Sequence, residues 1–372
     1  MSGASYEERR ALRESLRAFF ARYSPEAEVR RVMATDLGYD PALWRRMSDE
    51  LGLPGFALPV EYGGSGFGVG ELRIVLEEMG RALVCAPFLS SAVLAANTLL
   101  AADDTEACAE LLPGIADGTR IATLAALGAA GVYDSSDVFE IVAEATPGGV
   151  TLTGRRTFVP DALAADLFLV TATSDAGPAL YAVEATAPGV RRSALVTLDG
   201  TRKQGSVEFA QTPARLIGSP GQGRAVLERA LVLSSVALAA EHVGGARRAL
   251  EMAVEYAKVR EQFGRVIGSF QAIKHRCVEI LLGVEAATST VTAAAEAIDS
   301  HSAEYDQLAH LALGLAADAY LYAVTENIEI HGGIGFTWES AAHLYYKRGV
   351  TGTVTLGSPA ANRAALLTSM GR

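Results

Sequence analysis

The segment from Arg224 to Arg260 constrains the fold most, because it reads as one uninterrupted helix. It contains no proline, and its only glycines are the adjacent pair Gly244 and Gly245. At ~1.5 Å per residue it would span on the order of 55 Å. Two more long helical segments follow, at 270–300 and 303–329. The sequence therefore predicts that the last part of the chain, from residue 223 onward, is helical.

The remainder of the chain divides at about residue 120. Before it, apolar residues recur at helical spacing, for example Leu12, Leu16, Phe19 and Phe20. Between 121 and 216, short apolar runs alternate with turn residues at a spacing of roughly ten residues, which is typical of an antiparallel sandwich or barrel. We therefore expect an α+β protein of three domains: an N-terminal helical domain at 1–120, a middle β domain at 121–218 and a C-terminal helical domain at 219–372.

Charge and cysteine usage exclude several classes of protein. The formal net charge of −11 argues against a nucleic-acid partner, since binding to phosphates needs excess Lys and Arg. The three cysteines, Cys85, Cys108 and Cys277, lack metal-ligand spacing and are typical of a reducing, cytoplasmic compartment. No metal site is expected.

The first ten residues are polar and no uncharged apolar run reaches ~18 residues, so neither a signal peptide nor a membrane span is expected.

Three motifs carry a resemblance to a known family. They are YAKVREQFG at 256–264 followed by IGSFQ at 267–271, EIHGGIGF at 329–336, and the glycine-rich LPVEYGGSG at 58–66. On a helix–strand–helix scaffold these motifs resemble the flavin-dependent acyl-CoA dehydrogenase superfamily. The resemblance covers essentially the whole chain, and it implies that the C-terminal helices form a four-helix bundle.

This resemblance implies a specific chemistry. Members bind FAD noncovalently between the sheet domain and the C-terminal helices, and a second subunit of a dimer or tetramer completes the site. A carboxylate removes the α-proton of an acyl-CoA while a hydride leaves the β-carbon for the flavin. The product is a 2,3-enoyl-CoA, and an electron-transfer flavoprotein accepts the electrons.

The resemblance also implies which residues would hold FAD. Arg260 would pair with the pyrophosphate, Phe263 would pack on the cofactor, and Gly332 and Gly333 would let backbone amides approach a phosphate. From chemistry alone, Arg260 could equally be a solvated arginine at a helix end and Phe263 a core residue. His331 is expected to belong to the same cofactor loop or to a dimer contact. The full set of expected cofactor-binding residues is Arg260, Gln262, Phe263, Gln271, Phe158, Glu329, Gly332, Gly333 and Ser358.

The position of the catalytic base departs from the family pattern. Counting forward from Gly332 places Leu356 where the family commonly has its glutamate, with Gly357 and Ser358 matching the two residues after it. Leucine cannot accept a proton. Glu241 lies among small residues on the long helix, and a desolvated carboxylate is suited to general-base work. No cation stands three or four residues away, so we expect an isolated carboxylate and predict that Glu241 is the base, with Glu228 as its rival.

Further departures concern the flavin site of the middle domain. The hydroxyl-bearing flavin loop of the family is poorly matched by residues 123–130, and its W-I-T-N is replaced by residues 158–161. Phe158 can still stack on a flavin ring, whereas Pro160 donates no hydrogen bond. Glu329 replaces the usual glutamine. These departures leave three hypotheses.

The first hypothesis is an acyl-CoA dehydrogenase that resembles the branched- or bulky-substrate type, steroid side chains included. The second is a subunit of limited activity in a heteromeric dehydrogenase formed with a paralogue. The third is a flavin-dependent monooxygenase-like relative.

Overall fold

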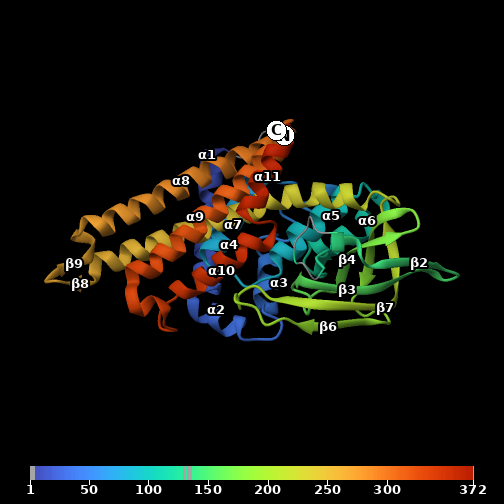
Figure 1. The fold of residues 1–372 in the computed structure, drawn as a ribbon, viewed down its shortest axis with the longest axis horizontal. Coiled ribbons are helices and arrows are strands. Elements are labelled where there is room, and N and C mark those ends of the chain that lie inside the picture. Colours follow the sequence, from blue (N-terminus) through green and yellow to red (C-terminus); the bar gives the residue numbers. More distant parts are fainter. Residues whose placement is uncertain (1–4, 129–130, 132–135, 372) are drawn as a thin grey trace. The chain divides into compact units, whose positions relative to one another are not determined.

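The chain folds as helices, then strands, then helices (Figure 1). The computed structural model describes residues 5–128, 131 and 136–371. The first helical part holds α1 (Tyr6–Tyr23), α2 (Glu26–Met33), α3 (Pro41–Asp49), η1 (Val60–Tyr62), α4 (Val69–Arg81), η2 (Phe88–Ala95), α5 (Ala96–Ala101) and α6 (Thr105–Ala116). The strands are β1 (Ala122–Ala125), β2 (Val142–Thr146), β3 (Gly149–Pro160), β4 (Leu167–Ser174), β5 (Gly177–Glu184), β6 (Val190–Ala194) and β7 (Gln204–Ile217), with η3 (Ser136–Phe139) before β2.

The second helical part begins with α7 (Gly223–Val259), the long helix predicted from the sequence. It continues with β8 (Glu261–Gln262), β9 (Arg265–Val266), η4 (Ile267–Ser269), α8 (Gln271–Asp299), α9 (Tyr305–His331), η5 (Gly332–Phe336), α10 (Ala342–Thr355) and α11 (Pro359–Ser369). The order of helical and β regions confirms the predicted fold class.

The chain forms two compact units, which are described separately. Unit 1 comprises 1–30, 68–84 and 235–372, and unit 2 comprises 31–67 and 85–234. Each unit is therefore assembled from segments distant in the sequence, and α7 contributes residues to both. The three domain boundaries expected from the sequence stay a prediction.

In unit 1, α1 is attached to α4 by a row of arginines. Arg9, Arg13 and Arg17 recur at a spacing of four residues, so they share one face of α1. The Nε atom of Arg9 donates to Glu71 (3.1 Å), and Arg13 and Arg17 both donate to Glu78 (3.0 and 2.8 Å). Glu71 and Glu78 are almost fully buried. Because each buried carboxylate has a cationic partner, the row fixes where α1 lies on α4.

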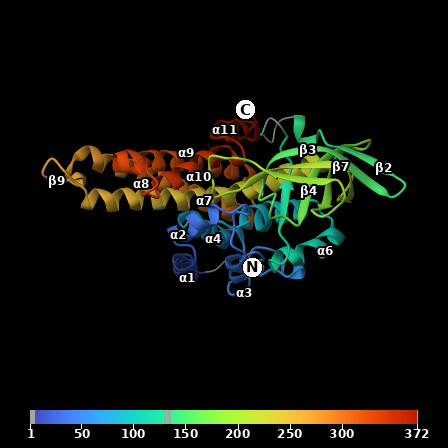
Figure 2. The same cartoon turned by 90° about the horizontal axis from the view of Figure 1, so that it is seen from below.

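The C-terminal helices of unit 1 pack around α9. Helix α8 lies beside α9 along much of its length, and α10 and α11 also pack on α9 (Figure 2). Alanines dominate these contacts, and Ala287, Ala294, Ala312, Ala316 and Ala323 are all buried. Small side chains permit close helix contacts, which explains the alanine-rich composition of this part of the sequence.

The strands of unit 2 form a closed barrel. β4 pairs with β2, β2 with β3, β3 with β7, β7 with β5, and β5 again with β4. The two remaining strands are not part of this ring: β1 pairs with β4, and β6 pairs with β7. The expected antiparallel pairing is present in most pairs, but β1–β4 and β2–β4 are parallel. A buried apolar cluster that includes Leu152, Phe168 and Phe209 fills the barrel. Pairing of β4 with both β1 and β2 could not be foreseen, because strand order depends on contacts between distant segments.

Two helical segments, Gln271–Asp299 and Tyr305–Phe336, are long and apolar enough to cross a membrane by length and composition alone, within the residues that the structure describes. This is a weak indicator, since helices in the core of soluble proteins pass the same test.

Candidate functional site

Glu241, the predicted base, forms a buried ion pair. It lies on α7 with 5% of its surface exposed, and Nη1 of Arg348 on α10 donates to its Oε1 at 2.7 Å. Arg348 is itself only 3% exposed. The expectation of an isolated carboxylate is therefore wrong, because its cationic partner comes from a helix 107 residues further along the chain. The role of Glu241 as base stays a prediction.

The small residues around Glu241 are used in helix packing. A Cβ atom at Gly244 would overlap the carbonyl oxygen of Glu77, and one at Gly80 would overlap that of Glu241. Helices α4 and α7 therefore cross with their backbones in contact. On another side of α7, a Cβ at Gly245 would overlap the ring of Tyr320 on α9. The stripe of small residues thus admits other helices of unit 1 at this level.

Leu356 and Ser358 lie where α10 gives way to α11. Leu356 is 8% exposed and follows the last residue of α10, so an apolar side chain is buried at the position of the family glutamate. Ser358 is the N-cap of α11, and its hydroxyl oxygen accepts a hydrogen bond from the amide of Ala361 (3.1 Å). A serine at this position is therefore also explained by helix capping.

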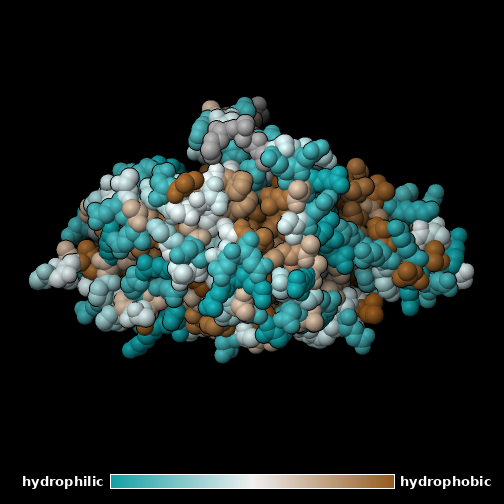
Figure 3. Space-filling view, turned by 180° about the vertical axis from the view of Figure 1, so that it is seen from behind, coloured by the Kyte–Doolittle hydropathy of each residue, from teal (hydrophilic) through white to brown (hydrophobic). Residues whose placement is uncertain are grey.

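Arg260 and the glycine pair occupy the same end of unit 1. Tyr256, one turn before Arg260, stacks on His331, which directly precedes Gly332, with 4.3 Å between ring centroids. Arg260 is exposed, and its guanidinium has no ion-pair partner among the described residues. Phe263 is 91% exposed with φ of +55°, so a large apolar side chain is presented to solvent rather than packed in the core. Figure 3 shows further hydrophobic residues on the surface of unit 1 toward this end.

The glycine pair leaves room for a ligand to approach the backbone. Gly332 has φ of +64°, which side chains rarely adopt, and a Cβ at Gly333 would meet nothing within 4 Å. Glu329 and Gln271 are both exposed, and Gln262 donates from Nε2 to the carbonyl of Glu261 (2.8 Å). The exposed guanidinium of Arg260, the accessible backbone of Gly333 and the exposed ring of Phe263 together fit the phosphate-bearing part of FAD.

Unit 2 holds the residues expected at the flavin ring. Phe158 is 37% exposed with φ of +51°, and its ring lies 3.0 Å from the position that a Cβ of Gly131 would take. The hydroxyl of Thr123 donates to the carbonyl of Pro160 (2.7 Å), and that of Ser90 donates to Asp161 (2.6 Å). These hydroxyls are thus already hydrogen-bonded within the chain. The last two residues of the loop at 123–130 lie outside the described residues.

The other candidate positions on α7 also fall in unit 2. Glu228 is exposed to solvent. Ser234, two helical turns before Glu241, accepts a hydrogen bond from Nδ2 of Asn97 on α5 (3.2 Å). Neither this contact nor the Glu241–Arg348 pair has a local sequence signal, because each joins helices far apart in the chain.

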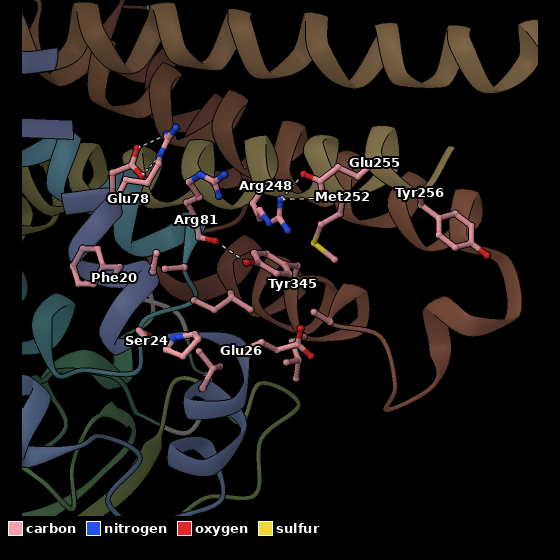
Figure 4. A pocket seen from close by; sticks show the side chains of 18 of the residues that line it. Phe20, Ser24, Glu26, Glu78, Arg81, Arg248, Met252, Glu255, Tyr256 and Tyr345 are labelled. Atoms are coloured by element: carbon pink, nitrogen blue, oxygen red, sulfur yellow. Dashed lines mark hydrogen bonds and ion pairs between the residues drawn. The ribbon is translucent and has the colours of Figure 1, made fainter. Parts of the chain in front are cut away.

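A cavity of about 760 Å³ lies within unit 1, lined by α1, α2, α4, α7 and α10 together with His331 (Figure 4). Met252 and Tyr345 point into it from α7 and α10. Apart from His331 of the expected cofactor loop, none of the residues predicted for catalysis or cofactor binding lines this cavity.

Comparison with known proteins identifies the family. The family model described as "Acyl-CoA dehydrogenase, N-terminal domain" matches residues 6–119, and "Acyl-CoA dehydrogenase, C-terminal domain" matches residues 221–370. The chain belongs to the acyl-CoA dehydrogenase family, oxidoreductases that act on CH–CH groups and are generally flavin-dependent. Its relatives include "Acyl-CoA dehydrogenase IpdE2" of Mycobacterium tuberculosis, 35% identical over 95% of this chain and 94% of that protein.

Solved structures agree with this assignment. A structure described as a "steroid ACAD", formed by Tcur3481 and Tcur3483, is 31% identical with a TM-score of 0.86 and covers 98% of both chains. The ChsE4–ChsE5 complex from Mycobacterium tuberculosis is 29% identical with a TM-score of 0.89, and the match covers 100% of this chain and 99% of that one. Butyryl-CoA dehydrogenase from Megasphaera elsdenii, 22% identical with a TM-score of 0.91 over the full length of both chains, shows the same fold.

Proposed function

We propose that this chain is part of a FAD-dependent dehydrogenase that desaturates the α,β bond of a branched or bulky acyl-CoA, such as one derived from a steroid side chain. The likeness to IpdE2 supports acyl-CoA dehydrogenation, and the likeness to a steroid acyl-CoA dehydrogenase supports the bulky substrate class. Bound FAD would supply the two-electron oxidation. The reduced enzyme would pass its electrons to an electron-transfer flavoprotein, in the cytoplasm.

One observation carries the assignment of FAD: the exposed Arg260 at the same end of unit 1 as Gly332 and Gly333. A guanidinium can bind a pyrophosphate through two parallel hydrogen bonds, and a glycine backbone can approach its oxygens. Both groups face outward from unit 1. They are therefore suited to a cofactor shared with a second subunit, in a homo-oligomer or a heteromer.

The hydrogen bonds of unit 2 support a second candidate function, in which the flavin site is shared with another chain. The hydroxyl of Thr123, in the segment that stands for the family's flavin loop, donates to the carbonyl of Pro160, so this donor is not available to a flavin ring. Pro160 itself lacks a donor. We therefore also propose that a paralogous chain supplies the flavin-ring half of the site, while this chain supplies the phosphate-binding half. The ChsE4–ChsE5 complex is a structural relative composed of two named chains.

The experiment compares this chain expressed alone and with a co-expressed paralogue. A yellow protein from the chain alone, bleached anaerobically by branched or steroid acyl-CoAs, supports the homo-oligomer. A colourless chain that becomes yellow and substrate-reducible only with the paralogue supports the shared site. Failure of every acyl-CoA to bleach a yellow preparation, or oxygen-dependent substrate hydroxylation, contradicts the dehydrogenase.

The role of Arg260 can be tested in whichever preparation binds FAD. We expect Arg260→Ala to weaken FAD retention on a desalting column without changing the thermal unfolding of the apoprotein, because the side chain is exposed. Arg363→Ala is the matched control, since Arg363 is an exposed arginine of unit 1 that pairs with Asp318 (2.7 Å). Equal FAD retention in both variants contradicts the assignment.

A further inference from the structure

The cavity of unit 1 has the size and construction of a small-molecule site. Its volume of about 760 Å³ falls within the range of known ligand pockets, and its wall combines apolar side chains with polar and charged ones. Phe20, Val29, Met252 and Leu344 supply apolar side chains from four different helices. The polarisable sulfur of Met252 points into the space and suits contact with a ring system (Figure 4).

The charged residues of the cavity compensate one another. Arg17, Arg81 and Arg248 line it together with Glu26, Glu78 and Glu255. The guanidinium of Arg17 pairs with Glu78 (2.8 Å) and that of Arg248 with Glu255 (3.2 Å).

Two further pairs use residues behind the wall: Arg81 pairs with Glu251 (2.5 Å), and Glu26 with Arg30 (2.7 Å). With every charged lining residue paired, the cavity offers no excess charge of either sign. A charged ligand would have to displace one of these pairs, whereas an uncharged ligand would not.

Two neutral groups offer hydrogen-bond acceptors. Burial raises the pKa of Tyr345 to about 12, so its hydroxyl stays protonated, and it donates to the carbonyl of Arg81 (2.6 Å). Its oxygen already takes part in a side-chain hydrogen bond with Arg248, which leaves one lone pair to accept from a ligand. Burial lowers the pKa of His331. Nδ1 of His331 lies 2.8 Å from the carbonyl of Asn327, which can only accept, so Nδ1 carries the proton and Nε2 is an acceptor.

We propose that this cavity binds an uncharged, largely apolar alcohol or phenol, whose ring body contacts Met252 and Leu344 and whose hydroxyl donates to Tyr345 or His331. An alcohol matches both the balanced charge of the lining and the acceptors that face the cavity. A hydrocarbon would make no hydrogen bond to Nε2 of His331, and an anion would gain no net attraction. This proposal does not depend on the reaction that the chain catalyses.

The test uses naphthol as the probe and the full-length protein, with binding followed by saturation-transfer NMR. We expect saturable binding of naphthol, and affinity roughly three- to tenfold lower for methoxynaphthalene, which keeps the rings but cannot donate. Naphthalene sulfonate and ADP should not displace naphthol. Displacement by either anion at equal concentration overturns the proposal, as does equal binding of methoxynaphthalene.

Variants locate the probe. Met252→Trp and Ala21→Trp each place a large ring at the wall from a partly or fully exposed position, so both should fold and abolish binding. Met370→Trp is the matched control, because Met370 is 48% exposed and does not line the cavity. Circular dichroism verifies folding. Unchanged binding in both cavity variants, or loss in the control as well, shows that naphthol binds elsewhere and overturns the proposal.

Discussion

Replacing Glu241 by glutamine separates a structural ion pair from a catalytic base. The two charged groups are 2.7 Å apart, and their side chains are 7% and 3% exposed. Removal of one partner from a buried pair typically costs about 3–5 kcal/mol, because the remaining charge is left in a medium of low polarity. The amide oxygen of glutamine can still accept from Arg348, so we expect Glu241→Gln to lose about 3 kcal/mol of unfolding free energy.

The measurement is urea unfolding at neutral pH, where a loss of stability moves the midpoint to lower urea. Glu285→Gln is the matched control: it breaks a surface pair with Arg247 whose glutamate is 55% exposed, and such pairs contribute about 0–1 kcal/mol. Glu241→Met combined with Arg348→Met should regain most of the stability, since buried pairs can be replaced by apolar residues at little cost. Coincident midpoints for Glu241→Gln, Glu285→Gln and the parent would refute this reasoning.

The same variants test catalysis. If Glu241 is the base, Glu241→Gln slows anaerobic flavin reduction by at least about a hundredfold while FAD stays bound. Arg348→Met provides the comparison, because it breaks the same ion pair and keeps the carboxylate. Loss of reduction in Glu241→Gln alone supports the base. Parallel losses in both variants, in proportion to the folded fraction, assign the pair a structural role.

Three further outcomes are expected. Gly244→Ala should prevent normal packing of α7 on α4 and lower the unfolding midpoint strongly, whereas Gly148→Ala, where a Cβ meets nothing within 4 Å, should leave it unchanged. Gly333→Ala should weaken FAD retention without lowering the stability of the apoprotein, and equal retention contradicts a close approach of phosphate. Backbone hydrogen bonds from Ala107 and Gly218 lower the pKa of Asp104 below 3.8. The ionised carboxylate therefore stabilises the fold above that pH, and this contribution is lost as the pH falls and Asp104 becomes protonated. Acid unfolding of Asp104→Asn should accordingly show a shallower loss of stability over the same pH range.

The fold was predictable wherever it depends on local periodicity. Helix α1 includes the apolar residues whose helical spacing predicted it, Leu12 to Phe20, and α7 continues through Gly244 and Gly245 because no proline interrupts it. Helix α2 was missed, since its eight residues carry too few apolar positions to show a period. The parallel pairing of β1 with β4 was also missed, because it joins segments separated by the β2–β3 hairpin.

The site was less predictable, because its contacts are long-range. Small residues around Glu241 indicate that something approaches α7 closely, but the sequence pattern does not distinguish a ligand from another helix. A Cβ at Gly244 would overlap the backbone of α4, so at Gly244 the group that approaches α7 is another helix of unit 1. Arg348 likewise has no local signal. Its guanidinium becomes the partner of Glu241 only when α10 packs beside α7.

The geometry favours a shared flavin site over a base displaced to α7. A base on α7 would have to act from within a buried ion pair, since Arg348 donates to Oε1 of Glu241 at 2.7 Å. A shared site does not involve this pair, and Arg260 and the backbone of Gly333 already face outward. Leu356 occupies the position of the family glutamate and cannot act as a base. With a shared site, no other carboxylate of this chain has to take that role, because the catalytic carboxylate can come from the paralogue. Under this hypothesis, flavin reduction in the heteromer survives Glu241→Gln at denaturant concentrations where the variant is folded.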